Sequence, residues 1–216
     1  MRKRFLIWLM RTRLFRWFMK DVIWWIRWSL YYATIRGSAY HQGYRHLTPG
    51  HIVLTVDRKK LTSLLIPGEM THAALCVGLV RDGAPYEIAE MTHTDYTKSH
   101  FFDICKEADR VVIMECVDFD ADYVNAMTRR CFSLEGSKYD CEFSLGVEAL
   151  YCSELIYQSD IGKRLLVSLE DLAGLGRPYI SPDGLLFGAN LVCIWDSDCK
   201  WTGWTGGQIR RAVKGA

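Results

Sequence analysis

The stretch ALYCSELIYQ (149–158) places one cysteine directly behind a tyrosine, at the start of a run with a helical pattern. A cysteine acts as a nucleophile when it is a thiolate, and the unpaired N–H groups and dipole of a helix N-terminus lower the pKa of a thiol. Cys152 therefore occupies a suitable place for a nucleophile, whereas a small buried core side chain is the alternative. The chain has eight cysteines, so position and not composition distinguishes this one.

A thiol nucleophile needs a base, and the chain has six histidines. His72 begins an apolar strand after a Pro-Gly loop, where rigid backbone would hold its ring. His93 and His100 lie in a polar stretch and are expected to be solvated. A third group should orient the imidazole, and Glu87 and Glu90 lie on the strand that is expected to pair with that of His72. Because side chains alternate along a strand, only one of these two glutamates can face the same side as His72.

At 216 residues, half of them apolar, the chain suits one sizeable globular domain. Strands are expected over residues 48–57, 72–80, 85–91, 110–117 and 190–195, and the turn RDGA joins the second and third as a hairpin. Helices are expected from Asp120 or Asp122 to about Leu134, and over residues 147–161. Helices that flank hairpin-connected strands predict an α+β fold with a mainly antiparallel sheet.

Six short segments follow one another along the chain in a recognisable series. They are Pro49-Gly50, Pro67-Gly68, Thr71-His72, Glu90, Gly136 with Tyr139-Asp140 and Phe143, and Tyr151-Cys152-Ser153-Glu154-Leu155. Together they resemble the permuted branch of NlpC-like, papain-like cysteine hydrolases, the YiiX-like group, in which the histidine strand comes first and the cysteine helix late. The resemblance covers about residues 46–195 and implies a circularly permuted papain-like, NlpC-like domain. We place that domain at residues 46–200, with a C-terminal tail over 201–216.

The resemblance implies a catalytic triad of Cys152, His72 and Glu90. Glu90 matches the family glutamate because an apolar residue and then a polar loop follow it, and Glu87 is kept as the alternative third member. The resemblance also places Tyr151 in the site, where its hydroxyl would join the backbone N–H of Cys152 in stabilising an oxyanion. Packing in the core is the alternative role for this tyrosine.

One residue departs from the family pattern. Where the family usually has Asp after the first Pro-Gly turn, this chain has His51. It lies on the strand before that of His72, where it either fills the space as a polar group or alters substrate recognition.

Residues 1–45 form a basic, aromatic N-terminal arm that we expect to be helical. Ten Lys or Arg and one acid give the arm about +9, so the other residues carry about −7 of the total of +2. Charged residues interrupt every window of about 20 residues in the arm. The sequence therefore argues against a transmembrane helix and against a cleavable signal peptide in this segment. The bias in sign favours contact of residues 1–36 with an anionic membrane surface, and packing on the domain or on a partner is the alternative. Bulky apolar residues between the basic ones argue against nucleic-acid binding.

These features predict a cysteine hydrolase or acyltransferase that forms a thioester and needs no metal or organic cofactor. No cysteines have the C-x-x-C spacing of a zinc site, and the scattered thiols favour a reducing compartment over a disulfide framework. The expected substrate is an amide, in a peptide or cell-wall peptide, or a lipid acyl group, and the expected location is cytoplasmic or peripheral to a membrane. The alternative is a non-enzymatic membrane- or particle-associated module that retains the fold.

Overall fold

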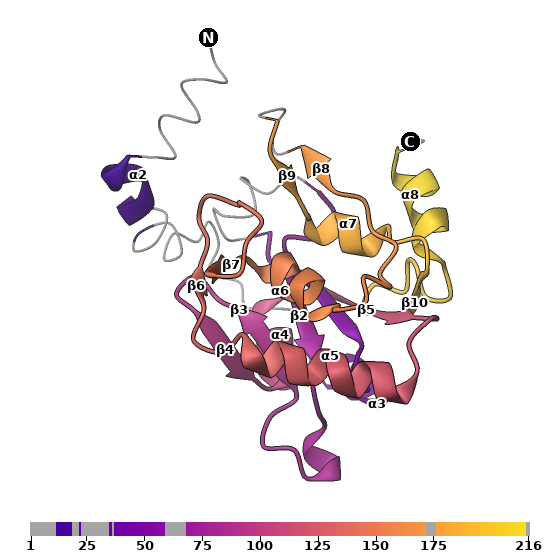
Figure 1. The fold of residues 1–216 in the computed structure, drawn as a ribbon. Helices are drawn as coiled ribbons and strands as arrows, with labels where there is room; N and C mark the ends of the chain where they lie inside the picture. The colour runs from indigo at the N-terminus through magenta and orange to yellow at the C-terminus, as the bar shows by residue number, and fades with distance from the viewer. Residues whose placement is uncertain are drawn as a thin grey trace.

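A six-stranded antiparallel sheet lies at the centre of the computed structural model, which describes residues 12–18, 22, 35, 37–58, 68–171 and 176–214 (Figure 1). From edge to edge the strands run β10 (Leu191–Asp196), β5 (Arg110–Cys116), β1 (Ile52–Val56), β2 (His72–Cys76), β3 (Ile88–Met91) and β4 (Tyr96–Ser99). Each of the five predicted strands is present, although most are shorter than predicted. The predicted α+β class with a mainly antiparallel sheet is confirmed.

Helices cover both faces of this sheet. The face that carries Ile52 and Leu54 packs against four helices: α5 (Ala121–Ser133), α6 (Cys152–Ser159), α7 (Pro182–Leu186) and α8 (Gly206–Lys214). The face that carries Val53 packs against α3 (Ser38–His46) and α4 (Phe101–Glu107). Because both faces are covered, β1 is buried at every position and its sequence IVLTV is nearly all apolar.

Short elements complete the described part of the chain. Lys138–Tyr139 (β6) pairs in parallel with Ala149–Leu150 (β7), and Glu170–Asp171 (β8) pairs with Pro178–Tyr179 (β9). A 3-10 turn, η4 (Val80–Asp82), lies between β2 and β3, and α2 (Arg13–Trp17) lies in the N-terminal arm. No helix in the described segments has the length and apolar character that crossing a membrane requires.

Of the two predicted helices, α5 begins where it was predicted and α6 is shorter than predicted. Asp120 caps α5, since its carboxylate accepts a hydrogen bond from the N–H of Tyr123 at 2.8 Å. The helix predicted over residues 147–161 is shorter, because α6 begins only at Cys152 and residues 149–150 pair as β7. This correction brings the helix N-terminus to the cysteine itself.

The residues after Thr92, expected to be a polar loop, contain β4 and α4 instead. His100 is the N-cap of α4, and its side chain is 50% exposed, which agrees with the expected solvation, while its ring also contacts the Glu87 carboxylate at 3.0 Å. The stretch reads as polar because β4 is an edge strand with an exposed lysine, Lys98.

The folded unit extends beyond residues 46–200. Gly43 of α3 lies so close to β10 that a Cβ atom there would be 2.9 Å from the Trp195 ring. At the other end, Trp201 and Ile209 are buried, and α8 packs on the core. Most of the predicted membrane-binding arm, residues 1–36, lies outside the described residues.

Candidate active site

Cys152 is the first residue of α6, and its side chain is buried. The parallel pairing of β6 with β7 ends at Leu150, and Tyr151 then adopts the extended conformation of an N-cap. The backbone N–H groups of the first helical turn have no partner within the helix. The predicted location of the cysteine at a helix N-terminus is therefore correct.

His72 lies between this thiol and a glutamate. Its Nε2 atom is 2.7 Å from Oε2 of Glu90, and hydrogen bonding to Cys152 as well as to Glu90 raises the pKa of the imidazole. Glu90 pairs with Ala74, so it lies on the same side of the sheet as His72, two residues away along β2. The other oxygen of Glu90 accepts a hydrogen bond from the Ser99 hydroxyl, which fixes the carboxylate.

The electrostatics of this pair favour the charged forms. Burial alone would raise the pKa of Cys152, but the hydrogen bond and charge of His72, with the N–H groups of Ala73 and Ser153, lower it. Burial alone would lower the pKa of His72, but its contacts with Cys152 and Glu90 raise it to about 10. Both shifts favour the thiolate–imidazolium form of the pair over the neutral form. The His72 side chain keeps 27% of its surface exposed, so the imidazole is open to solvent whereas the Cys152 thiol is buried.

The other buried thiols behave in the opposite way. Burial raises the pKa of the Cys131 thiol. It raises the pKa of four other thiols to about 11 or 12, namely those of Cys76, Cys105, Cys116 and Cys193. All eight cysteines lie within the described segments and are free thiols, so the pair Cys193 and Cys199 forms no disulfide. Cys152 is thus a buried thiol whose pKa is lowered by a specific partner.

Glu87, the alternative third member, lies elsewhere. Its carboxylate contacts the His100 ring at 3.0 Å, the Tyr44 hydroxyl at 3.2 Å and the backbone N–H of Phe101 at 3.1 Å. These contacts join α3 and α4 to the sheet. The structure therefore brings Glu90 to His72 and assigns Glu87 to a structural cluster.

Two tyrosines lie near the thiol. The hydroxyl of Tyr151 accepts a hydrogen bond from the N–H of Ile180 at 2.9 Å, and the residue is 1% exposed. Tyr139 is partly exposed, and burial together with the nearby Cys152 raises the pKa of its hydroxyl. Reasoning from the sequence assigned no role to Tyr139, although it belongs to the Gly-x-x-Tyr-Asp segment that carried the resemblance.

His51 lies at the opposite end of β1 from this site. The residue of β1 that pairs with His72 is Thr55, whereas His51 precedes the first residue of the strand. Its ring contacts the Thr48 hydroxyl and the carbonyl of His46, at 2.7 and 3.0 Å respectively. Of the two readings of this substitution, the structure supports a polar group that fills space.

Glu154 is a buried carboxyl two residues after the nucleophile. It is 0% exposed, and Oε1 accepts hydrogen bonds from the Gly146 N–H at 2.6 Å and the Gln158 amide at 3.3 Å. Oε2 has no hydrogen-bond partner among the described residues. Burial raises the pKa of this carboxyl to about 7. These contacts join α6 to the loop before β7 and give Glu154 a structural role.

The family model described as permuted papain-like amidase enzyme, YaeF/YiiX, C92 family, matches residues 46–184. The chain belongs to this family. Its general activity is therefore that of a papain-like cysteine hydrolase of the amidase type, and the predicted permuted papain-like fold is confirmed.

A solved structure shares the fold of this amidase-family chain. The crystal structure of metalloprotein YiiX from Escherichia coli O157:H7 has a TM-score of 0.57 at 16% sequence identity, and the similarity covers 73% of this chain and 98% of YiiX. The comparison with curated proteins gives no match.

The description of YiiX as a metalloprotein led us to test whether this chain offers a metal site. Within the described ranges, no group of three or more His, Cys, Asp or Glu side chains is arranged to hold a metal ion. In the site itself, Nε2 of His72 is already engaged by Glu90. The residues of the described segments therefore do not fit a metal ion.

Proposed function

We propose that this protein catalyses acyl transfer through a thioester on Cys152, with His72 as the base and Glu90 as the residue that orients the imidazole. The observation that carries the proposal is the contact of one histidine with both the thiol and the glutamate. The pKa of the thiol is lowered in this arrangement, which supplies the thiolate that nucleophilic catalysis requires.

In the first step the Cys152 thiolate attacks the carbonyl carbon of the substrate and forms a tetrahedral oxyanion. The oxyanion collapses to a thioester as the bond to the leaving group breaks, and the His72 imidazolium gives its proton to the leaving amine or alcohol. His72 then takes a proton from water, which attacks the thioester carbonyl and releases the acid. The thiol sulfur leaves as the thiolate, and the imidazolium is restored.

The backbone N–H of Cys152 and the hydroxyl of Tyr139 are the donors that we propose for the oxyanion. Tyr139 lies near the thiol and is partly exposed. Tyr151 is the alternative donor, because its hydroxyl accepts a bond from the N–H of Ile180 and keeps its own proton to donate, but the residue is 1% exposed and a substrate oxygen has little access to it. Loss of one such donor costs about 100-fold or more in kcat. Tyr139→Phe is therefore expected to lower kcat by that factor, and a larger loss in Tyr151→Phe with no loss in Tyr139→Phe would reverse the assignment.

The substrate that we propose first is an amide of a peptide or cell-wall peptide, in keeping with the amidase family. A lipid acyl group is the second candidate because of the arm. In α2, Leu14 is 72% exposed and Trp17 is 54% exposed, next to basic Arg13. Apolar and cationic side chains on one exposed segment suit contact with an anionic membrane surface, which we propose as a partner.

The test combines thiol labelling with a substrate panel. Mild alkylation with iodoacetamide at neutral pH, followed by peptide mass spectrometry, is expected to modify Cys152 before the exposed Cys199. The wild type and Cys152→Ala are then compared on peptide amides and on lipid esters, where only the wild type should release product. Equal labelling of the two cysteines would instead support the non-enzymatic module.

A further inference from the structure

Residues 180–183, which follow β9, contact the two sequence neighbours of Cys152 and the loop that leads to His72. At one end of this segment, the N–H of Ile180 donates to the Tyr151 hydroxyl at 2.9 Å. The carbonyl of Ile180 accepts a hydrogen bond from the Ser153 hydroxyl at 2.7 Å. Tyr151 and Ser153 are both buried and lie on either side of Cys152 in the sequence. The backbone of Ile180 is thereby attached to the two neighbours of the nucleophile.

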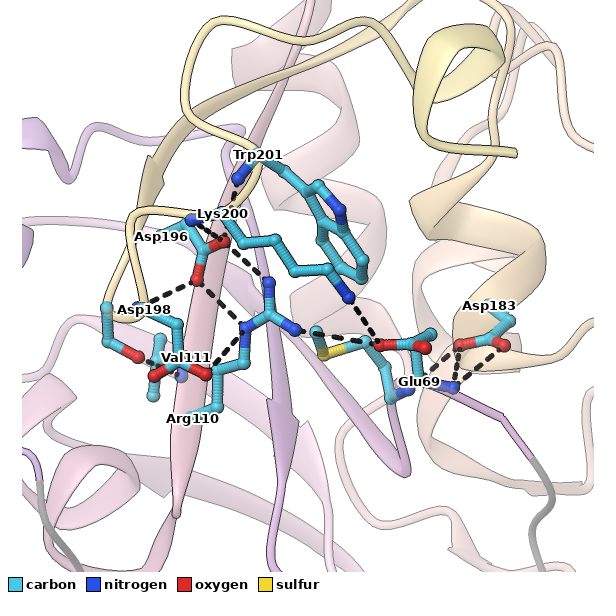
Figure 2. Close-up of polar contacts among 10 residues, drawn as sticks. Glu69, Arg110, Val111, Asp183, Asp196, Asp198, Lys200 and Trp201 are labelled. Atoms are coloured by element: carbon cyan, nitrogen blue, oxygen red, sulfur yellow. Dashed lines mark hydrogen bonds and ion pairs between the residues drawn. The ribbon is translucent and has the colours of Figure 1, made fainter. Parts of the chain in front are cut away.

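At the other end, Asp183 holds the loop that leads into β2 (Figure 2). Its carboxylate accepts hydrogen bonds from the N–H of Glu69 at 3.0 and 3.1 Å and from the N–H of Met70 at 2.8 Å. Bonds from N–H groups to a carboxylate are charge-assisted and stronger than neutral ones. Met70 is fully buried, and His72 follows two residues later. Asp183 therefore fixes the backbone immediately before the histidine.

At Gly68 the backbone of this loop lies close to the Asp183 carboxylate. The residue has a φ of +146°, and a Cβ atom built on it would collide with Oδ2 of Asp183. Only glycine permits both this backbone conformation and this close approach. The glycine before the histidine strand thus has a physical reason, which is the space that Asp183 occupies.

Two cations, the buried Arg110 and the exposed Lys200, hold the same loop from its other side (Figure 2). The Glu69 carboxylate lies 3.6 Å from the Arg110 guanidinium and 3.8 Å from the Lys200 ammonium. Arg110 makes two hydrogen bonds with Asp196, at 2.6 and 2.9 Å, and its guanidinium lies 4.0 Å from the centre of a Trp201 ring. The loop before β2 is therefore held by Asp183 on one side and by Arg110 and Lys200 on the other.

We propose that residues 180–183 form a bridge that sets the position of His72 relative to Cys152, with Asp183 as a positioning residue. The inference rests on the proposed function, since it concerns the same two side chains. Cys152 and His72 lie on separate elements, α6 and β2, and their hydrogen bond depends on the alignment of those elements. Hydrogen bonds from a single short segment to both elements keep that alignment, while Asp183 itself touches neither the thiol nor the imidazole.

The experiment measures the rate of iodoacetamide alkylation of Cys152 as a function of pH in the full chain. The variants are Asp183→Ala, which removes all the carboxylate bonds, and Asp183→Asn, which places an amide NH₂ group against a backbone N–H. The matched control is Asp120→Ala, which also removes a carboxylate that accepts a backbone N–H, at 2.8 Å, but at the start of α5. Circular dichroism identifies the variants that fold, and Asp183→Asn decides the result if Asp183→Ala does not.

If the bridge positions the pair, the acid limb of the Cys152 profile moves toward the pKa of an ordinary thiol in the Asp183 variants. A rise of one pKa unit lowers the thiolate fraction, and hence the rate, about tenfold at pH values below the wild-type pKa. The Asp120 control is expected to stay within about twofold of wild type. An unchanged profile in Asp183→Asn, or an equal shift in the control, would overturn the positioning role. A wild-type Cys152 with the profile of an ordinary thiol would overturn the proposed function itself and the bridge with it.

Discussion

Glu154→Gln should remove a measurable pH dependence of stability. In the folded protein burial raises the pKa of the Glu154 carboxyl from 4.5 to about 7. Since the folded-state pKa lies above the unfolded value, protonation stabilises the folded protein. That stability is fully present below about pH 4.5 and is lost as the pH rises through about 7. The glutamine keeps an oxygen for the Gly146 N–H but carries no charge at any pH.

The size of the effect follows from the same pKa values. Each pKa unit corresponds to about 1.4 kcal/mol, so the wild type should lose about 2.5 kcal/mol of unfolding free energy relative to Glu154→Gln between pH 5 and pH 8. Urea denaturation at a series of pH values measures this difference, and m-values show whether the unfolding stays two-state. The control is Glu148→Gln, at an exposed glutamate on the loop that contains Gly146. Its unfolding free energy should show the same pH dependence as that of the wild type. A wild type that keeps a constant difference from Glu154→Gln, within about 0.5 kcal/mol across this range, would refute the reasoning.

Three further outcomes are expected. Glu90→Gln should slow turnover and alkylation of Cys152, whereas Glu87→Gln should affect mainly stability; the reverse pattern in an activity assay would contradict the assignment of the third member. Arg110→Met should cost about 3 to 5 kcal/mol of unfolding free energy, because it leaves the buried Asp196 carboxylate without its cation. A loss below about 1 kcal/mol in a thermal or urea melt would contradict this expectation. Deletion of residues 1–36 should abolish flotation with liposomes that contain anionic lipid and leave the alkylation rate of Cys152 unchanged. Flotation that survives the deletion would exclude the arm as the membrane anchor.

Much of the fold could be predicted because its signals are local. The strands β1 and β5 are runs of apolar residues of a length that suits strands buried on both faces, and α5 has an aspartate at its start. The series of short segments supplied what periodicity cannot, namely the chain order of the histidine strand, the glutamate strand and the cysteine helix.

The elements that were missed have weak local signals. The edge strand β4 has the sequence YTKS, which is mostly polar because one side of an edge strand meets solvent. The helix α8 has the sequence GGQIRRAVK, and its place in the core depends on the single buried side chain of Ile209. Neither segment could be distinguished from a loop or a tail by composition, since long-range packing decides their structure.

The kinds of reactive group in the site could be predicted from the sequence alone. They are a cysteine at a helix start, a histidine at a strand start and a glutamate on the next strand. Which of these groups lie in contact depends on the tertiary structure. The β2–β3 register brings Glu90, and not Glu87, to His72, and the contacts of residues 180–183 with both α6 and the loop before β2 link the cysteine to the histidine. The reason is physical: local patterns depend on neighbours in the sequence, whereas a contact between distant residues depends on strand register and packing.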